Sequence, residues 1–319
     1  MDKFEAGIPG QDWDAKVAAL GGGILQSRGW ALFQQALGRK TWFAGGGDWL
    51  CLAVERRGRG IKYLYSPYGP VSKSSGQAAM RALAELGSSL KADFVRVEPT
   101  AAEPARSDLV RVGDVQPSRT VILDLSKSEE ELKNGISQSN RNLINQAAGR
   151  GLTISSQAQP TAQDVEAFIA MLKRTAKQAG FQIYDDEYYR QTFQILSPLG
   201  MCSLYSAGAE GQTVAMAVAF DFAGTRYYAH AAADAELNRQ HKAAVPLLWQ
   251  MVADAKSGGQ KRFDFWGIAP NDDPGHPMAG LTRFKLSFGG DIKTYAGTWD
   301  RPLKPAKYQL YRFAKKVLA

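Results

Sequence analysis

One lysine in this chain has neighbours that would suit it to chemistry. Lys285 directly follows Phe284, in a short segment that ends at the pair Gly289-Gly290. A lysine among aromatic side chains can hold a phosphate, stabilise a developing oxyanion or, when desolvated, take up a proton. It can also lay its methylene stem over aromatic surface while its ammonium reaches water. Local chemistry alone slightly favours this second, structural interpretation.

A second candidate is His230, which follows Tyr227 and Tyr228 in a segment with the composition of a strand. Alternation along a strand would place Tyr228 and His230 on one face. Taken alone, His230 is better explained as a histidine that is hydrogen-bonded in the core or at a sheet edge. No histidine lies in an HExxH motif and no serine in GxSxG, so nothing indicates a metalloprotease or a serine hydrolase.

The sequence also gives no sign of a metal or of a bound cofactor. Cys51 and Cys202 lie far apart, and neither has a partner at metal-ligand spacing. No GxGxxG loop and no GxxxxGK(S/T) loop is present. Where an acyl-CoA acetyltransferase would have a glycine in its phosphate-binding loop, the run 239–244 has Lys242, whose side chain would obstruct the phosphate. We therefore expect no metal and no coenzyme A.

The charge of the chain favours an anionic partner. The net charge is +8, from 39 Lys and Arg against 31 Asp and Glu, which suits RNA, a phosphorylated substrate or an acidic lipid surface. The C-terminal run 301–319 carries basic residues interleaved with aromatics and contains no acid. A solvated terminal helix and a contact for RNA phosphate or anionic lipid explain this run equally well.

Hydrophobic periodicity predicts elements in an order that occurs twice along the chain. Each half runs through a strand, a strand pair and helices, which predicts an α/β fold made of two similar units. The predicted strands are 49–57, 61–66, 94–99, 120–126, 152–157, 201–208, 212–222, 226–233, 262–268 and 291–299, and the predicted helices are 26–38, 77–90, 128–149, 161–180, 186–196, 242–256 and 281–288. No signal peptide and no window of membrane-spanning length is found, so we expect a cytoplasmic protein.

Segments spread over nearly the whole chain resemble, in order and spacing, those of the Fem family (FemX, FemA and FemB), the aminoacyl-tRNA-dependent transferases of peptidoglycan cross-bridge synthesis. These segments are ILQSRGWALFQ, KYLYSPYGPV, VILDLS, SQSNRNLINQA, GRGLTI, RYYAHAAA, RFDFWGI and TRFKLSFGGDIKTYAGTW. The resemblance implies an α/β (α+β) fold of two tandem GNAT-like (acyl-CoA N-acyltransferase-like) domains. It places the first at residues 1–125 plus 296–319 and the second at residues 126–295, in the compact FemX form without a coiled-coil arm.

The reaction that the resemblance implies is aminolysis of an ester. An amine in the stem peptide of a peptidoglycan precursor (lipid II or UDP-MurNAc-peptide) attacks the ester that joins an amino acid to tRNA. The implied partners are aminoacyl-tRNA, that precursor and, peripherally, the inner face of the membrane. Because ester aminolysis is downhill, the protein has to align the amine, accept its proton and stabilise the oxyanion. Lys285 matches the family's functional lysine, which stabilises the reacting centre, and Phe284 matches the phenylalanine that shapes the pocket for the acceptor end.

The precursor-binding positions that the resemblance implies are Gln34, Tyr184, Tyr188, Tyr228 and His230. Gln34 and Tyr184 stand where FemX-like members have phosphate-binding cations, and His230 stands where a tyrosine is expected. The pyrophosphate would then be held differently, or the acceptor would differ.

The candidate contacts for tRNA or phosphate are Arg141, Lys242 and Arg283. Read alone, Arg141 is an ordinary surface charge. Two alternatives to the implied activity stay open: a GNAT-fold acyltransferase with another donor or acceptor, and a non-catalytic tRNA-binding protein.

Overall fold

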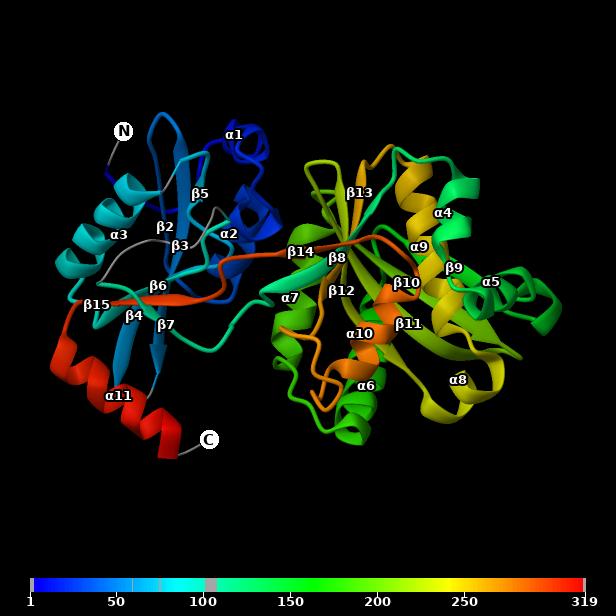
Figure 1. Ribbon diagram of the computed structural model, residues 1–319. Coiled ribbons are helices and arrows are strands. Elements are labelled where there is room, and N and C mark those ends of the chain that lie inside the picture. The colour runs from blue at the N-terminus through cyan, green and yellow to red at the C-terminus, as the bar shows by residue number, and fades with distance from the viewer. Residues whose placement is uncertain (1–2, 59, 75, 101–107, 318–319) are drawn as a thin grey trace. The chain divides into compact units, whose positions relative to one another are not determined.

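The computed structural model describes residues 3–58, 60–74, 76–100 and 108–317. Its internal contacts divide the chain into two compact units, which are Met1–Ser118 with Thr294–Ala319, and Arg119–Lys293. The sequence placed the corresponding domain boundaries at residues 125 and 296. Each unit contains one mixed sheet with helices on its faces, and the two are coloured mainly blue to cyan with red, and green to orange, in Figure 1.

Unit 1 is built on an eight-stranded sheet within the described residues. Its order is β1 (Glu5–Ala6), β2 (Thr41–Gly45), β3 (Trp49–Gly58), β4 (Ile61–Ser66), β6 (Phe94–Val97), β15 (Trp299–Pro302) and β7 (Val110–Arg111), with β5 (Val71–Ser72) paired to β3. The pair β4–β6 is parallel, and the other pairs are antiparallel. The helices of unit 1 are α1 (Trp13–Ala19), the 3-10 turn η1 (Ile24–Gln26), α2 (Arg28–Ala36), α3 (Gln77–Ser89) and α11 (Pro305–Val317).

Unit 2 is built on a seven-stranded sheet within the described residues. Its order is β14 (Asp291–Thr294), β8 (Arg119–Asp124), β13 (Arg262–Gly267), β12 (Thr225–Ala233), β11 (Gln212–Phe222), β10 (Cys202–Ala209) and β9 (Thr153–Gln157). Strands β12 and β13 are parallel and pair only from Thr225 and Arg262 to Tyr227 and Asp264. The turn that joins β11 to β12 is Ala223-Gly224, and both residues have positive φ.

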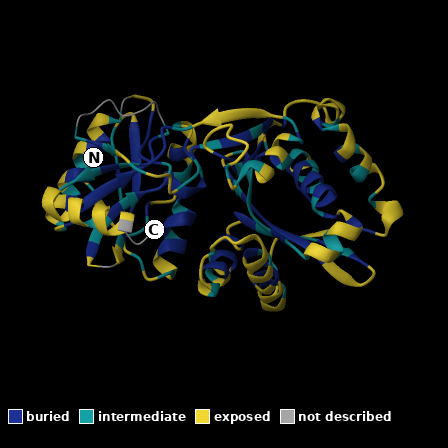
Figure 2. Ribbon diagram, turned by 60° about the horizontal axis from the view of Figure 1, so that its bottom comes forward, coloured by how far each residue is buried: buried dark blue, intermediate teal, exposed yellow. Residues whose placement is uncertain are grey.

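Helices cover both faces of the unit 2 sheet (Figure 2). One face packs on α9 (Ala244–Ser257), whose Leu248, Met251 and Val252 are fully buried against Ala217 and Ala219 of β11. The short helices α4 (Glu129–Gly135), α5 (Gln138–Asn145) and α10 (Ala279–Leu286) contribute to the same core. The other face carries α6 (Ala162–Ala179) and α7 (Asp186–Leu196), and the connection from β12 to α9 contains α8 (Ala235–His241). The two faces therefore bury different sets of side chains.

Both units follow the same order of elements, as the sequence predicted. In unit 1 the antiparallel strands β2, β3 and β4 lead through α3 to the parallel strand β6, and in unit 2 β10, β11 and β12 lead through α9 to β13. In each unit a strand from elsewhere in the chain then pairs antiparallel with this parallel strand. β15 pairs with β6 in unit 1, and β8 pairs with β13 in unit 2.

Two sequence predictions were wrong in detail, and some elements were not predicted. The predicted helix 128–149 is broken into α4 and α5, because Ile136 and Ser137 are extended (ψ 144° and 146°) and α5 begins at Gln138. The predicted strand 291–299 is β14 and β15, which belong to different sheets and are separated by a stretch containing Gly297 at φ 73°. The helix α8 was not predicted, since its sequence AELNRQH has no apolar periodicity.

A buried ion pair fastens the C-terminal segment to unit 1. Arg96 of β6 donates two hydrogen bonds of 2.7 Å to the carboxylate of Asp300 on β15, and both side chains are buried. The hydroxyl of Tyr308 on α11 donates to the same carboxylate at 2.9 Å. Because each charge is desolvated, either one would be costly without its partner.

We predict that Asp300→Ala lowers the free energy of unfolding by about 3–5 kcal/mol, because it leaves the Arg96 guanidinium buried and unpaired. Denaturant titration followed by tryptophan fluorescence measures this. The matched control is Asp272→Ala, which removes an ion pair whose acid is 86% exposed and should cost less than about 1 kcal/mol. Equal effects of the two substitutions would contradict the prediction.

Candidate functional site

A β-bulge decides which side chains of β12 lie together. The register pairs Tyr228 with Ala219 and His230 with Val218, so that Ala229 has no partner on β11. Because adjacent residues of β11 point to opposite faces, Tyr228 and His230 do as well. The predicted shared face for these two residues is therefore wrong. The strict alternation on which it rested is interrupted by the extra residue.

Tyr228 lies on the α9 side of the sheet, together with Lys285. Its ring packs against the core that contains Ala219, and the Nζ of Lys285 lies 5.8 Å from the ring centroid. Burial raises the pKa of the Tyr228 hydroxyl far above its usual value, so this group stays protonated. Phe284 packs on the same core and contacts Phe288 edge to face, with 5.5 Å between ring centroids.

Lys285 is held on α10 as a buried ammonium. Its side chain is 5% exposed, and its Nζ donates to the carbonyl of Gly267 at 2.7 Å. Gly267 lies beyond the last residue of β13 that pairs with β12. Among the described residues no other acceptor lies within reach of Nζ. An ammonium has three N–H donors, so two of them have no hydrogen-bond partner in the described part of the protein.

The environment of Lys285 changes its acidity. Burial lowers the pKa of its ammonium to about 8, and the nearby carboxyl of Asp264 opposes that shift. Burial in turn raises the pKa of Asp264, opposed by hydrogen bonds from the Thr120 hydroxyl and the Trp266 N–H. The single hydroxyl hydrogen of Thr120 faces two close acceptors, Asp264 Oδ1 and Trp266 O, and a more distant one, Val121 O at 3.5 Å. A proton on Asp264 would let the carboxyl donate to Thr120 while the hydroxyl donates to Trp266 O.

Two glycines fix the end of α10. Gly289 and Gly290 have φ of 79° and 94°, a region that other residues adopt only under strain. A Cβ on Gly289 would lie 2.9 Å from the carbonyl oxygen of Gly135, and one on Gly290 would lie 2.7 Å from that of Ile122. The glycine pair noted in the sequence is thus required by close backbone contacts, which set the position of the helix that carries Lys285.

The other face of β12 carries an aromatic cluster around His230. Tyr184 and Tyr188 stack with 3.9 Å between ring centroids, and the His230 ring meets both edge to face. Burial lowers the pKa of His230 to about 4, so the imidazole is neutral at physiological pH. Tyr184 is 48% exposed, which leaves the cluster open to solvent at one side.

The remaining predicted residues do not join either group. Gln34 is buried on α2 in unit 1, where its Oε1 accepts a hydrogen bond from Arg39 at 2.8 Å. Arg141 donates to carbonyls at the end of α4 and to Gln138, so its guanidinium has structural partners. Lys242, at φ 55° after α8, and Arg283 on α10 are exposed.

Two features of the structure were not predicted from the sequence. Trp266 adopts φ 60° and contacts Phe220 and Tyr227 on the face opposite Lys285, although no pattern in the sequence marks its strained backbone. Arg39 follows Gln34 by five residues, and its guanidinium donates to the Gln34 side chain, so a cation lies beside Gln34. Within the described residues, no group of three or more His, Cys, Asp or Glu side chains could hold a metal ion.

Comparison with known proteins then decides the family. The sequence profile of the FemAB family matches residues 107–197 and 203–316, which is well over half of the chain. The chain belongs to the FemAB family. The family predicted from the ordered segments is thereby confirmed.

The relatives of this FemAB protein differ in how much of it they match. FemA of Staphylococcus epidermidis is 28% identical over 79 residues, which are 25% of this chain and 19% of FemA. FemA of Staphylococcus aureus is 28% identical over 91 residues, which are 28% of this chain and 21% of FemA. The matched stretch thus spans about a fifth of the length of these curated relatives.

Solved structures establish the fold of this FemAB protein. The crystal structure of FemX has a TM-score of 0.79 at 18% identity and covers 96% of this chain and 99% of its own. A tandem GNAT protein from clavulanic acid biosynthesis has a TM-score of 0.54 at 13% identity, with coverage of 94% and 98%. The predicted fold of tandem GNAT-like units is confirmed. No helix in the described part of the chain is long and apolar enough to cross a membrane.

We predict that Lys285→Met stabilises the protein at about pH 7 by up to about 3 kcal/mol, because a pKa that falls from 10.5 to about 8 on folding measures the cost of burying the charge. Below about pH 8 the lysine is protonated in both states and the cost is fully present. As pH rises from about 8 to 10.5, the folded protein loses the proton and the advantage of methionine disappears.

Urea titrations at about pH 7 and pH 9.5 measure this difference, with Lys177→Met on exposed α6 as the control that should change little at either pH. Destabilisation by Lys285→Met at both pH values would show that the ammonium is a structural anchor.

Proposed function

We propose that this protein is an aminoacyl-tRNA-dependent aminoacyltransferase that adds an amino acid to the stem peptide of a lipid-linked or UDP-linked peptidoglycan precursor. Membership of the FemAB family and the naming of its FemA relatives as aminoacyltransferases support this reaction class. The observation that carries the proposal is the Lys285 ammonium. It is buried with one N–H bonded to Gly267 and two left for a substrate oxygen.

In the proposed reaction the neutral amine of the stem peptide attacks the carbonyl carbon of the aminoacyl ester. A C–N bond forms, the C–O bond to the 3′ oxygen of tRNA breaks, and the proton lost by the amine ends on that oxygen. The tetrahedral intermediate carries an oxyanion, which the two free N–H groups of Lys285 would stabilise at low local dielectric. Packing of Phe284 on the core and the rigid end of α10 would keep the ammonium in place.

The N-terminus of α9 supports a donor other than coenzyme A. In a GNAT-like fold the helix that follows the central hairpin would offer its first N–H groups to a pyrophosphate. Here the N–H of Ala244 is donated to Asn238 Oδ1, and Pro246 has no N–H. Lys242 precedes this turn, where the sequence already argued against a phosphate loop. We therefore propose that no cofactor takes part and that tRNA delivers the acyl group.

Arg39 is a candidate cation for a phosphate of the precursor. Gln34 replaces a basic residue of FemX-like members, but its side chain is bonded to Arg39, so a guanidinium is present beside that position. We propose Arg39, in unit 1, as a contact for a precursor phosphate. The stacked rings of Tyr184 and Tyr188 would take the place of the second cation by contacts to the peptide or sugar part. A lipid-linked precursor would also bring the protein to the inner face of the membrane.

We expect transfer of a labelled amino acid from tRNA to a UDP-linked or lipid-linked muropeptide, and a loss of about 100- to 1,000-fold in kcat/KM in Lys285→Ala. The control is Lys177→Ala, at an exposed position of α6, and it should keep full activity. Transfer to no precursor would refute the proposal. Clear binding of acetyl-CoA in calorimetry would favour a different acyl donor, and tRNA binding without any transfer would favour a non-catalytic role.

The pH dependence distinguishes a cationic Lys285 from a basic one. If the ammonium stabilises the oxyanion, kcat/KM should be lost as pH rises through about 8, the pKa of Lys285. If the neutral amine acted as a base, kcat/KM would rise over the same interval.

The variant Lys285→Arg keeps its charge at high pH. The substrate amine titrates equally with both enzymes, so the ratio of wild-type to variant kcat/KM isolates Lys285. A ratio that increases with pH would contradict the proposed role.

A further inference from the structure

The C-terminal helix α11 has two apolar stripes, and only one of them is used by the fold. Tyr308 is fully buried and Tyr311 is partly buried, and both rings contact Phe94 of β6. Leu310 and Phe313 lie on the opposite side and are 67% and 68% exposed, more than the other large apolar residues described. With exposed Ala306 they follow the spacing i, i+4, i+7, which forms a continuous stripe along a helix.

Basic residues lie on both sides of this exposed stripe. Helical geometry places Lys307 on one side and Arg312 and Lys316 on the other, and the helix contains no acidic residue. A helix with an apolar stripe between rows of Lys and Arg is the pattern of segments that lie in the interface of a membrane.

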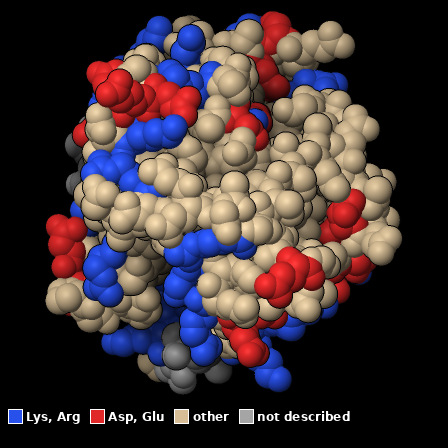
Figure 3. Space-filling view, turned by 90° about the vertical axis from the view of Figure 1, so that its right-hand side faces the viewer, with Lys and Arg blue, Asp and Glu red and all other residues tan. Residues whose placement is uncertain are grey.

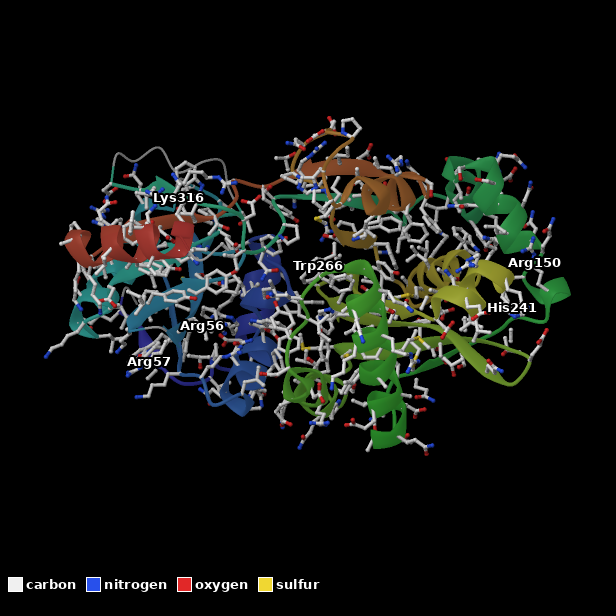
Figure 4. All side chains as sticks on the ribbon, turned by 90° about the horizontal axis from the view of Figure 1, so that it is seen from below. Arg56, Arg57, Arg150, His241, Trp266 and Lys316 are labelled. Atoms are coloured by element: carbon white, nitrogen blue, oxygen red, sulfur yellow. The ribbon has the colours of Figure 1, made fainter. Side chains whose placement is uncertain are left out.

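A basic groove adjoins this helix within unit 1. It has a volume of about 620 Å³ and lies between α11 and the β3–β4 hairpin, with Arg56, Arg57, Lys307 and Lys315 among its lining. Arg57 is paired with Glu55, and Lys307 with Asp93. No acid pairs with Arg56 or Lys315 among the described residues, so the groove keeps positive charge. Figure 4 labels Arg56 and Arg57 on β3, and Lys316 on α11.

Elsewhere the surface is not uniformly basic. The face in Figure 3 carries groups of Asp and Glu as well as Lys and Arg, with uncharged side chains between them. A partner attracted only by the net charge of +8 would have no reason to prefer α11. The combination of an unpaired apolar stripe and unpaired cations is what distinguishes this helix.

We propose that α11 and the adjoining basic groove dock on the surface of an anionic phospholipid membrane. The stripe of Leu310 and Phe313 enters the boundary between headgroups and acyl chains, and the surrounding cations lie against lipid phosphates. RNA would satisfy the cations but leave the stripe in water, whereas a membrane satisfies both. In its biological setting this inference rests on the proposed function, because a lipid-linked acceptor would lie in the same membrane.

Vesicle flotation tests the proposal with the full chain. We expect binding to vesicles of phosphatidylcholine with about 30% phosphatidylglycerol, little binding to phosphatidylcholine alone, and weakening with salt. The double variant Leu310→Ser, Phe313→Ser should bind at least about tenfold more weakly, because the apolar stripe is lost. Arg56→Gln with Lys315→Gln should lose about fivefold for each charge removed.

Matched controls come from exposed residues of unit 2. Phe181→Ser with Leu199→Ser removes comparable apolar surface, and Arg174→Gln with Lys177→Gln removes two charges, and neither should change vesicle binding. All substituted side chains are exposed or line the open groove, so thermal unfolding should match that of the wild type. Equal binding to neutral and anionic vesicles, or unchanged binding by the α11 variants, would overturn the proposal.

Other occupants give different results. If the α11 and groove variants lose tRNA affinity and keep vesicle binding, the surface binds RNA and the membrane proposal fails. A third outcome would identify a second copy of the chain as the partner. In that case the wild type binds no vesicles and dimerises in sedimentation velocity, whereas the variant Phe313→Ser is monomeric. Transfer to a soluble UDP-linked precursor should survive in the α11 variants. Failure of all transfer, with vesicle binding intact, would refute the proposed function alone.

Discussion

A cationic nitrogen that is removed from water but only partly hydrogen-bonded is the constraint on which unit 2 depends. Burying the Lys285 ammonium is unfavourable by itself, and the fold offsets this only in part, with the Gly267 carbonyl, the Tyr228 ring and the nearby Asp264. The close backbone approaches at Gly289 and Gly290 hold the segment that follows α10 against Gly135 and Ile122. Under the proposed function, this local cost in stability would be the counterpart of a preorganised charge for the oxyanion.

The bulge at Ala229 gives the unit 2 sheet two distinct chemical faces. Tyr228 and Lys285 lie on the side covered by α9 and α10, whereas His230 joins Tyr184 and Tyr188 under α7. The parallel pairing of β12 and β13 stops at Tyr227 and Asp264, just before this bulge. One irregular residue therefore separates a charged group from an aromatic group that a regular strand would have merged.

Family membership and local geometry contribute different parts of the proposal. The FemAB match gives the family and the FemX structure gives the fold, whereas the curated relatives align over a limited stretch. What the geometry adds is chemical detail: the free donors of Lys285, the occupied N-terminus of α9, and Arg39 beside Gln34. The C-terminal helix adds a surface of another kind, in which apolar and basic side chains suit a lipid boundary.

The sequence by itself determined the two α/β units, most strands and helices and the family, because periodicity and ordered segments can be read along a chain. It also predicted Lys285 as a candidate functional residue. It failed where one residue changes a register or a boundary, as at Ala229, Ile136 and Gly297. Only the tertiary structure decided that Lys285 is buried and that Tyr228 and His230 face apart. These facts depend on contacts between segments distant in the chain or on a bulge set by pairing, and no local pattern encodes either.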